Sequence, residues 1–313
     1  MTEANAARDE LGRPPPAATL AWAALSEGRG ASVISLRFLT GGRSHANHLL
    51  VIEDRQGRRR RRVLRRWARP GWAEDDPDFD AAREAATLTR LERAGVPAPR
   101  LVAADLDGSE TDVPALLETV VPGRRVARPR DLEAFVDGLA AAIQTVHLVP
   151  AAATDQAIGY RRFYDPATLR PPGWARSPDT WARAIDFARR PVIRGPSGFI
   201  HRDYHPGNVL WHGGDIRRGV SGIVDWTSAS SGPFGVDVGH MRFNLAAALG
   251  PEAADRFAAL AARHGVAPGC SPEWDIRATL DVLPEITGGP ESRAELDRIE
   301  AHVARALDQL GLI

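Results

Sequence analysis

The sequence predicts an α+β protein of two lobes, a small lobe with an antiparallel, β-rich sheet and a larger helical lobe. Two patterns predict this division. Between residues 32 and 120, most segments show the short apolar alternation of strands. After residue 123, apolar residues recur with helical spacing. Pro122 and Gly123 stand where the pattern changes, and strands followed by helices are typical of an α+β fold.

The small lobe is expected to contain five strands and one helix. Strands are predicted at residues 32–39, 49–52, 62–65, 101–104 and 114–120, with a turn at 53–61 that holds an arginine run. The helix is predicted over residues 80–94, because Gly95 closes it and Pro97 follows. We expect residues 1–16 to form a flexible lead-in, 17–117 the small lobe, 118–123 a hinge and 124–313 the larger lobe.

The larger lobe is expected to be mostly helical. Apolar periodicity predicts helices at residues 131–146, 180–189, 236–249, 253–264 and 292–310. Residues 166–178 are rich in proline, which predicts a loop between helices.

Composition narrows the class of protein. The 313 residues include 40 Lys+Arg and 40 Asp+Glu, so the net charge is zero and argues for neither a nucleic-acid nor a membrane partner. No apolar run approaches the roughly 20 residues of a membrane helix. A single cysteine, Cys270, excludes an intrachain disulfide and favours a reducing cytoplasm. The chain contains no lysine, so every one of its 40 basic residues is an arginine.

The most informative segment is residues 199–211, Phe-Ile-His-Arg-Asp-Tyr-His-Pro-Gly-Asn-Val-Leu-Trp. It places Asp203 five residues before Asn208, and Asp225 follows a second apolar strand pattern. One carboxylate can orient a substrate hydroxyl, while an amide and a second carboxylate supply the hard oxygens that Mg²⁺ shares with phosphates. The same order of groups occurs in the phosphoryl-transfer site of kinases, so the spacing predicts phosphoryl transfer.

These motifs resemble the aminoglycoside phosphotransferase (choline kinase-like) family, a branch of the protein-kinase-like fold. The runs that carry the resemblance are His-Arg-Asp-Tyr-His-Pro-Gly-Asn-Val-Leu from residue 201, Ile-Val-Asp-Trp from residue 223 and Gly-Pro-Phe-Gly-Val-Asp-Val-Gly from residue 232. The resemblance extends more weakly upstream to about residue 33, so it covers most of the chain. It implies a two-lobed protein-kinase-like fold.

The resemblance also implies roles for particular residues. Asp203 would be the catalytic aspartate, and Asn208 and Asp225 would hold magnesium. Asp237 would brace the catalytic loop, and we expect His201 to support that loop by hydrogen bonding and not to bind a metal.

The nucleotide-binding residues are expected in the small lobe. Gly41, Gly42 and Ser44 resemble the short phosphate loop of the family, in which backbone N–H groups approach the phosphates, although a plain hairpin turn is the alternative. The third predicted strand places Arg65 where kinases have a phosphate-binding lysine, with Glu84 as its ion-pair partner. The strand register leaves the neighbouring Arg66 as a second candidate for this role.

The hinge and the acceptor site are less marked in the sequence. In this fold, hinge main-chain groups bind adenine, which implies a nucleotide contact at Glu118, Thr119 and Val120. The implied cofactors are ATP, with GTP as an alternative, and Mg²⁺. Asp281 and Glu285 lie four residues apart and would share a face if one helix carried both, so they are candidates for binding an acceptor, with a solvated helix face as the alternative.

The sequence therefore predicts an ATP-dependent small-molecule O-phosphotransferase. A nucleotide-binding pseudokinase with a regulatory or scaffolding role stays open, because Arg65 replaces the usual lysine. A nucleic-acid binder that uses the arginine run at residues 58–62 is the third hypothesis. We expect a nucleotide and a small hydroxyl acceptor as partners, no nucleic acid and no membrane, and a monomer or homodimer. The sequence does not identify the acceptor.

Overall fold

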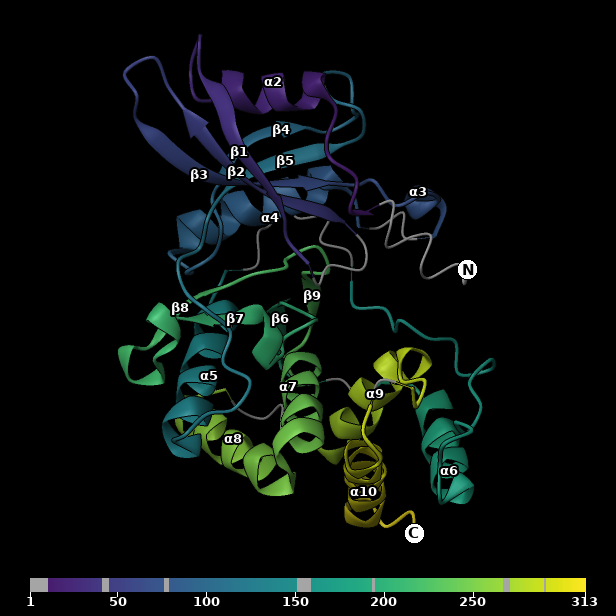
Figure 1. The fold of residues 1–313 in the computed structure, drawn as a ribbon. Helices are drawn as coiled ribbons and strands as arrows, with labels where there is room; N and C mark the ends of the chain where they lie inside the picture. The colour runs from purple at the N-terminus through teal and green to yellow at the C-terminus, as the bar shows by residue number, and fades with distance from the viewer. Residues whose placement is uncertain are drawn as a thin grey trace. The chain divides into compact units, whose positions relative to one another are not determined.

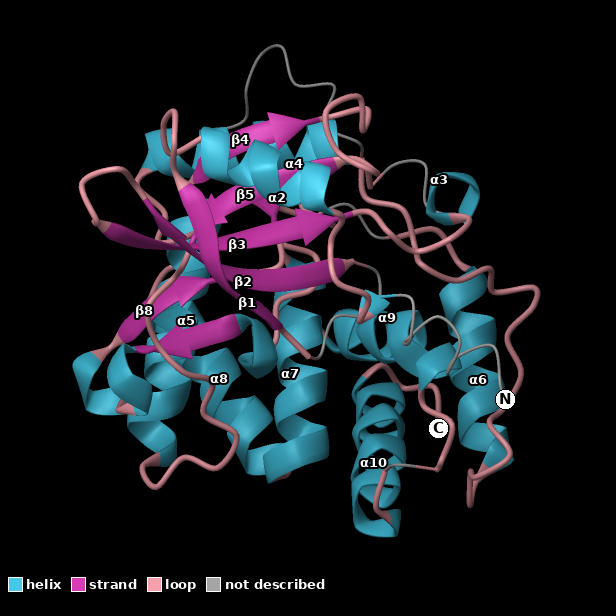
Figure 2. Cartoon of the chain, turned by 45° about the horizontal axis from the view of Figure 1, so that its top comes forward, coloured by secondary structure: helices cyan, strands magenta, loops and turns pink. Residues whose placement is uncertain are grey.

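The structure is a computed structural model that describes residues 11–40, 45–75, 79–150, 159–192, 195–266, 271–289 and 291–313. The chain divides into two compact units, Met1–Val121 and Pro122–Ile313 (Figure 1). The longest strands belong to the first unit and most of the helices to the second (Figure 2). The structure therefore has the predicted α+β class. Among the described helices, none has the length and apolar character needed to cross a membrane.

The first unit is built on a five-stranded antiparallel sheet with the strand order β1-β2-β3-β5-β4. Its strands are β1 (Ser32–Phe38), β2 (Ala46–Glu53), β3 (Arg59–Arg66), β4 (Leu101–Asp105) and β5 (Ala115–Thr119), and its helices are α2 (Ala17–Leu25), α3 (Trp72–Asp75) and α4 (Ala81–Ala94). All five predicted strands are present. The predicted turn at 53–61 is too long, because three arginines at its end belong to β3 and pair with β2.

The two faces of this sheet carry different helices. Leu50, Leu64 and Leu117 are fully buried on the face that packs against α2, in a cluster with Ala23. Neighbouring side chains in a strand point to opposite faces. Arg65 therefore points to the other face, where it meets α4. In Figure 1, α2 and α4 lie on opposite sides of the sheet.

Three features of the first unit were not predicted, and the short helix α3 is one of them. Leu11 is only 2% exposed, so the expected flexible lead-in is wrong for this residue, while residues 1–10 lie outside the described residues. Helix α2 was missed because it carries weak signals. Its N-cap is Pro16, which makes no side-chain capping bond, and its first turn contains no acidic residue.

The described part of the second unit contains six α-helices, four short strands and several 3₁₀ turns. The helices are α5 (Leu132–His147), α6 (Pro178–Arg189), α7 (Gly235–Leu249), α8 (Pro251–Arg263), α9 (Pro272–Val282) and α10 (Arg293–Gln309). The strands are β6 (Ser197–Ile200), which pairs with β9 (Ser230–Pro233), and β7 (Val209–Trp211), which pairs with β8 (Val220–Ile223). The five predicted helices are all present, and Asp131 and Ser292 cap the first and the last of them.

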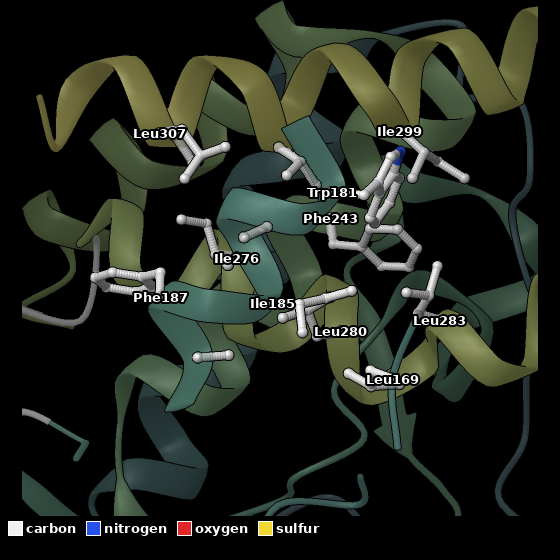
Figure 3. Close-up of a cluster of buried hydrophobic side chains, with 14 of the residues drawn as sticks. Leu169, Trp181, Ile185, Phe187, Phe243, Ile276, Leu280, Leu283, Ile299 and Leu307 are labelled. Carbon is white, nitrogen blue, oxygen red and sulfur yellow. The ribbon is translucent and has the colours of Figure 1, made fainter. Parts of the chain in front are cut away.

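One hydrophobic core of the second unit lies among α6, α7, α9 and α10. Figure 3 shows Trp181 and Ile185 of α6 packed among Phe243, Leu280 and Ile299, and each of these five side chains is buried. Burial of this apolar area is the main term that stabilises the unit.

Helix α9 was not predicted because its buried residues include charged ones. The Nε atom of Arg277 donates to Glu273 at 2.7 Å, and both side chains are nearly inaccessible to solvent. Asp275 accepts two hydrogen bonds from Arg242 of α7, at 2.7 and 2.8 Å. Buried ion pairs thus take the place of an apolar stripe on this helix. From the sequence alone, the segment has the polar composition of a surface segment.

The close approach of α7 and α9 makes Gly239 a sensitive position. A Cβ atom at Gly239 would lie 2.4 Å from the carbonyl oxygen of Trp274. We expect Gly239→Ala to lower the free energy of unfolding by about 1–3 kcal/mol, because overpacking outweighs the gain in helix propensity. Urea unfolding measures this. In Gly289→Ala, the matched control, the nearest atom lies 3.5 Å from the new Cβ. An equal effect in both variants would contradict the packing argument.

Candidate active site

The loop between β6 and β7 is fixed from outside by Asp237, in the first turn of α7. Asp237 is fully buried, and its carboxylate accepts hydrogen bonds from the backbone N–H groups of His201 at 3.0 Å and Arg202 at 2.6 Å. A third contact, at 2.9 Å, joins it to Nε2 of His147 at the end of α5. Burial alone would raise the pKa of Asp237, but the hydrogen bond and charge of His147 and the contacts with His201 hold it below its ordinary value.

His201 joins this loop to the end of β8. Its Nε2 lies 3.0 Å from the carbonyl oxygen of Val224, and its Nδ1 accepts a hydrogen bond from the backbone N–H of Asp203 at 3.3 Å. These two bonds assign the proton to Nε2. The ring packs against Trp226 with centroids 4.4 Å apart. His201 is fully buried and serves the loop through hydrogen bonds and packing.

Asp203 and Asn208 lie in direct contact. The Nδ2 atom of Asn208 donates to the backbone oxygen of Asp203 at 3.0 Å and to its Oδ2 at 3.2 Å. The side chain of Asp203 is 40% exposed, so its carboxylate is accessible to a substrate. Because Asn208 uses its amide nitrogen in this way, its carbonyl Oδ1 is the atom available to a cation.

Asp225 follows β8 and is exposed, in a backbone conformation with φ of 69°. Arg202 has a φ of 74°, and these are the only non-glycine residues with positive φ among the described residues. Such a conformation costs on the order of 1 kcal/mol or more and is common at functional sites. Asn208 and Asp225 together offer hard oxygen donors, which fit Mg²⁺. Within the described ranges, no three His, Cys, Asp or Glu side chains are grouped closely enough to hold a metal.

In the first unit, Arg65 is buried and held by three side chains. Its Nε atom donates to Glu84 at 3.0 Å, one terminal nitrogen lies 3.5 Å from Oδ1 of Asn47, and the other lies 3.2 Å from Nδ1 of His45. The predicted pair with Glu84 is therefore formed. Arg66 points to the opposite face and pairs with Asp112, its Nε atom lying 3.1 Å from Oδ1. Strand register thus separates the two arginines that the sequence left open.

Other predicted nucleotide-binding residues are described only in part. Gly41, Gly42 and Ser44 lie outside the described residues. Glu118 and Thr119 end β5, and the Thr119 N–H donates to the carbonyl of Arg100 at 2.9 Å. This N–H is thus used in a contact between β4 and β5, and the main-chain nucleotide contact expected at Thr119 stays a prediction. Glu118 is paired with Val63 of β3 in the sheet, and Val120 follows the end of β5.

The candidate acceptor residues do not form an exposed pair. Helix α9 ends at Val282, so Asp281 lies in its last turn while Glu285 lies in the following 3₁₀ turn. Asp281 is buried and accepts a hydrogen bond from the Phe163 N–H at 2.9 Å, whereas Glu285 is exposed. The expectation that one helix face carries both carboxylates is wrong. A cavity of about 420 Å³ is lined by residues 168–170, 172–174, 283–284 and 286–287, and neither Asp281 nor Glu285 lines it.

The site contains residues that the sequence did not single out. Asn47 and His45 at Arg65, and His147 at Asp237, have no motif that marks them. His240 of α7 was also missed, and its Nδ1 lies 3.7 Å from Oδ1 of Asp203. The only sequence signal for His240 is its position three residues after Asp237, which places both on one helix face.

Solved structures share this two-lobed fold. A macrolide 2′-phosphotransferase from Brachybacterium faecium is 20% identical, with 93% of this chain and 97% of that chain covered and a TM-score of 0.57. An aminoglycoside-3′-phosphotransferase of type VIII is 18% identical (84% and 93% covered, TM-score 0.56). A thermostable mutant of an aminoglycoside phosphotransferase, in complex with ADP and hygromycin B, is 16% identical (88% and 95% covered, TM-score 0.57). Comparison with curated proteins gave no match.

The antiparallel sheet, the helical unit and these likenesses define a protein of the kinase-like fold. Residues 35–265 match the model of the phosphotransferase enzyme family. The chain belongs to this family and is a phosphotransferase.

The burial of Asp281 predicts a pH-dependent stability. Burial raises the pKa of Asp281 from 3.8 to about 6. Because this pKa is higher in the folded state than in the unfolded state, the protonated carboxyl group of Asp281 stabilises the fold. This stabilisation is fully present below about pH 4 and is lost as the pH rises through about 6. We expect Asp281→Asn to gain about 2–3 kcal/mol relative to the wild type between pH 4.5 and pH 7.5, measured by urea unfolding. Glu285→Gln, at an exposed carboxylate, is the control. A difference between Asp281→Asn and wild type that is the same at both pH values would contradict this account.

Proposed function

We propose that the protein transfers the γ-phosphate of ATP, bound with Mg²⁺, to a hydroxyl group of a small molecule. The observation that carries this proposal is the accessible carboxylate of Asp203, held against Asn208 on a loop that Asp237 braces. Family membership supports the same reaction class. It gives no support to a pseudokinase.

Asp203 is the proposed catalytic residue. Its carboxylate accepts a hydrogen bond from the acceptor hydroxyl and takes the proton as the hydroxyl oxygen forms its bond to the γ-phosphorus. The bond between that phosphorus and the bridging oxygen breaks, and its electron pair leaves on ADP. The hydrogen bond from Asn208 restricts rotation of the carboxylate and so orients it for this contact.

Nucleotide contacts are proposed separately for residues of each unit. Asn208 and Asp225 would hold Mg²⁺, which offsets phosphate charge when bound. Arg65, oriented by Glu84, contacts the phosphates as the kinase lysine does, and its planar fork suits phosphate oxygens. Further phosphate contacts are proposed for the phosphate loop, through Gly41, Gly42 and Ser44. Further nucleotide contacts are proposed for the main chain at Glu118 and Val120. GTP is the alternative nucleotide.

The acceptor is proposed to bind in the second unit near the catalytic loop. Structures that share the fold include a complex with hygromycin B. A cationic amino-sugar acceptor would require acidic side chains in this chain. Asp281 and Glu285 are the proposed acidic contacts for such a molecule. Asp281 requires a rearrangement of its surroundings to reach one, because it is only 7% exposed.

We propose that neither nucleic acid nor a membrane is a partner, that the protein acts in the cytoplasm and that it is a monomer or homodimer. The arginine run supports the first point, because acidic neighbours engage its charges. These ion pairs join Glu27, Glu53 and Asp54 to Arg58, Arg59, Arg60 and Arg62. Binding to generic DNA that weakens steeply with salt would contradict this point.

One experiment tests the reaction class. The protein is incubated with MgATP or MgGTP and a panel of hydroxyl compounds: hygromycin B, kanamycin, erythromycin, choline, homoserine and glucose. Mass spectrometry then follows the phosphate mass increment. We expect one class of compound to gain one phosphate. Absence of any transfer and of any nucleotide turnover would overturn the proposal.

Replacement of Asp203 tests its role. We expect Asp203→Asn to lower kcat by about 10²–10⁴-fold, because the amide cannot take the proton. Binding of MgATP, measured by calorimetry, should be unchanged. Asp186→Asn, at an exposed carboxylate of α6, is the control. Wild-type kcat in Asp203→Asn would disprove the assignment.

The two arginines of β3 form a matched pair. We expect Arg65→Lys to raise the KM for MgATP about tenfold, or ~1.4 kcal/mol, because a lysine reaches Glu84 but does not reproduce the planar contacts with Asn47 and His45. Arg66→Lys should leave the KM unchanged, since Arg66 points to the opposite face of the sheet. The same KM change in both variants would contradict the assigned register.

A further inference from the structure

His240 is a buried histidine that needs an explanation. Its ring is 2% exposed, and neither ring nitrogen has a hydrogen-bond partner among the described residues. Buried polar groups are nearly always hydrogen-bonded, because leaving water without a new partner costs free energy. A phenylalanine or leucine would fill the same space without this cost. The histidine is therefore expected to form a bond in another state of the protein.

The proposed catalytic carboxylate lies close to His240. Nδ1 of His240 lies 3.7 Å from Oδ1 of Asp203, a few tenths of an ångström beyond hydrogen-bond distance. The other oxygen of Asp203, Oδ2, already accepts a hydrogen bond from Asn208 at 3.2 Å. His240 thus faces the carboxylate oxygen that Asn208 does not hold.

Helix α7 carries both supports of the loop on one face. Asp237 and His240 are three residues apart, the spacing that aligns side chains along a helix. Asp237 binds the backbone of the loop, and His240 faces the carboxylate of the same loop. A small shift of the loop toward α7 would close the gap at His240 without moving the helix.

The surroundings of His240 favour its neutral form. Burial lowers its pKa, although the charge of Asp203 opposes this effect; His205, Asp237 and Arg202 are the other charged or titratable groups that act on it. A neutral imidazole carries one N–H group. With the proton on Nδ1, that group can donate to Asp203.

We propose that His240 is a positioning residue, whose Nδ1–H donates a hydrogen bond to Oδ1 of Asp203 when nucleotide and acceptor are bound. Asn208 and His240 then hold one oxygen each and fix the plane of the carboxylate. Each oxygen keeps a lone pair for the acceptor hydroxyl. This inference rests on the proposed role of Asp203 as the group that takes the hydroxyl proton.

Three substitutions of His240 test this role. An asparagine amide nitrogen can occupy nearly the position of Nδ1, a glutamine amide nitrogen reaches the position of Nε2, and leucine supplies no donor. With MgATP and the panel compound that the wild type phosphorylates, we expect His240→Leu and His240→Gln to lower kcat about tenfold. His240→Asn should keep most of the wild-type kcat. Calorimetric Kd values for MgATP should be unchanged in all three.

Two further measurements separate this role from a structural one. His240→Leu should unfold at or above the wild-type temperature, because it removes a buried group without a partner. In wild-type protein bound to Mg²⁺, the non-hydrolysable nucleotide AMP-PNP and the panel compound that the wild type phosphorylates, the ¹⁵N shifts of the His240 ring should report the Nδ1–H tautomer. Wild-type kcat in His240→Leu, equal losses in the asparagine and leucine variants, or an Nε2–H tautomer would overturn the inference. A wild type inactive with every panel compound would instead contradict the proposed function.

Discussion

The geometry of the catalytic loop in the second unit depends on the hydrogen bonds that the carboxylate of Asp237 accepts. This carboxylate receives hydrogen bonds from two successive backbone N–H groups of the loop and contacts His147 from α5. Hydrogen bonds to a charged group contribute about 1.5–3 kcal/mol each, so they offset the cost of burying this carboxylate. Its place in the first turn of α7 adds the favourable field of a helix N-terminus. The loop is thus positioned by two helices in addition to the hydrogen bonds that its own residues form.

This support also explains how the loop sustains strained backbone. Arg202 has positive φ, and its N–H is one of the two that Asp237 holds. Asp225 has positive φ directly after Val224, whose carbonyl is bound by His201. The side chain of Arg202 offsets part of the strain, because its guanidinium lies 3.5 Å above the ring centroid of Phe163. Both strained positions adjoin groups proposed to act on phosphate, where a fixed orientation favours reaction.

The sequence predicted the elements whose signals are local. Helix α4 has an aspartate cap and a closing glycine, and both are found in the structure. The residues it missed depend on distant partners. His147 is 90 residues from the aspartate that it contacts, and nothing in its own neighbourhood marks it. The choice between Arg65 and Arg66 likewise required the positions of Glu84 and Asp112, which lie 19 and 46 residues away from them. Periodicity describes one segment at a time, so contacts of this kind lie beyond it.

The surroundings of Arg65 bear on why this lysine-free chain uses an arginine there. Compositional bias alone would replace a lysine without changing its neighbours. Here the guanidinium meets three different groups. They are the carboxylate of Glu84 from α4, the amide oxygen of Asn47 from β2 and the imidazole nitrogen of His45. A guanidinium has five donors spread over a fixed plane, whereas the three donors of an ammonium radiate from one nitrogen, so a guanidinium reaches partners that lie farther apart. The arrangement around Arg65 therefore suits an arginine specifically, and bias in composition is not a sufficient account of this residue.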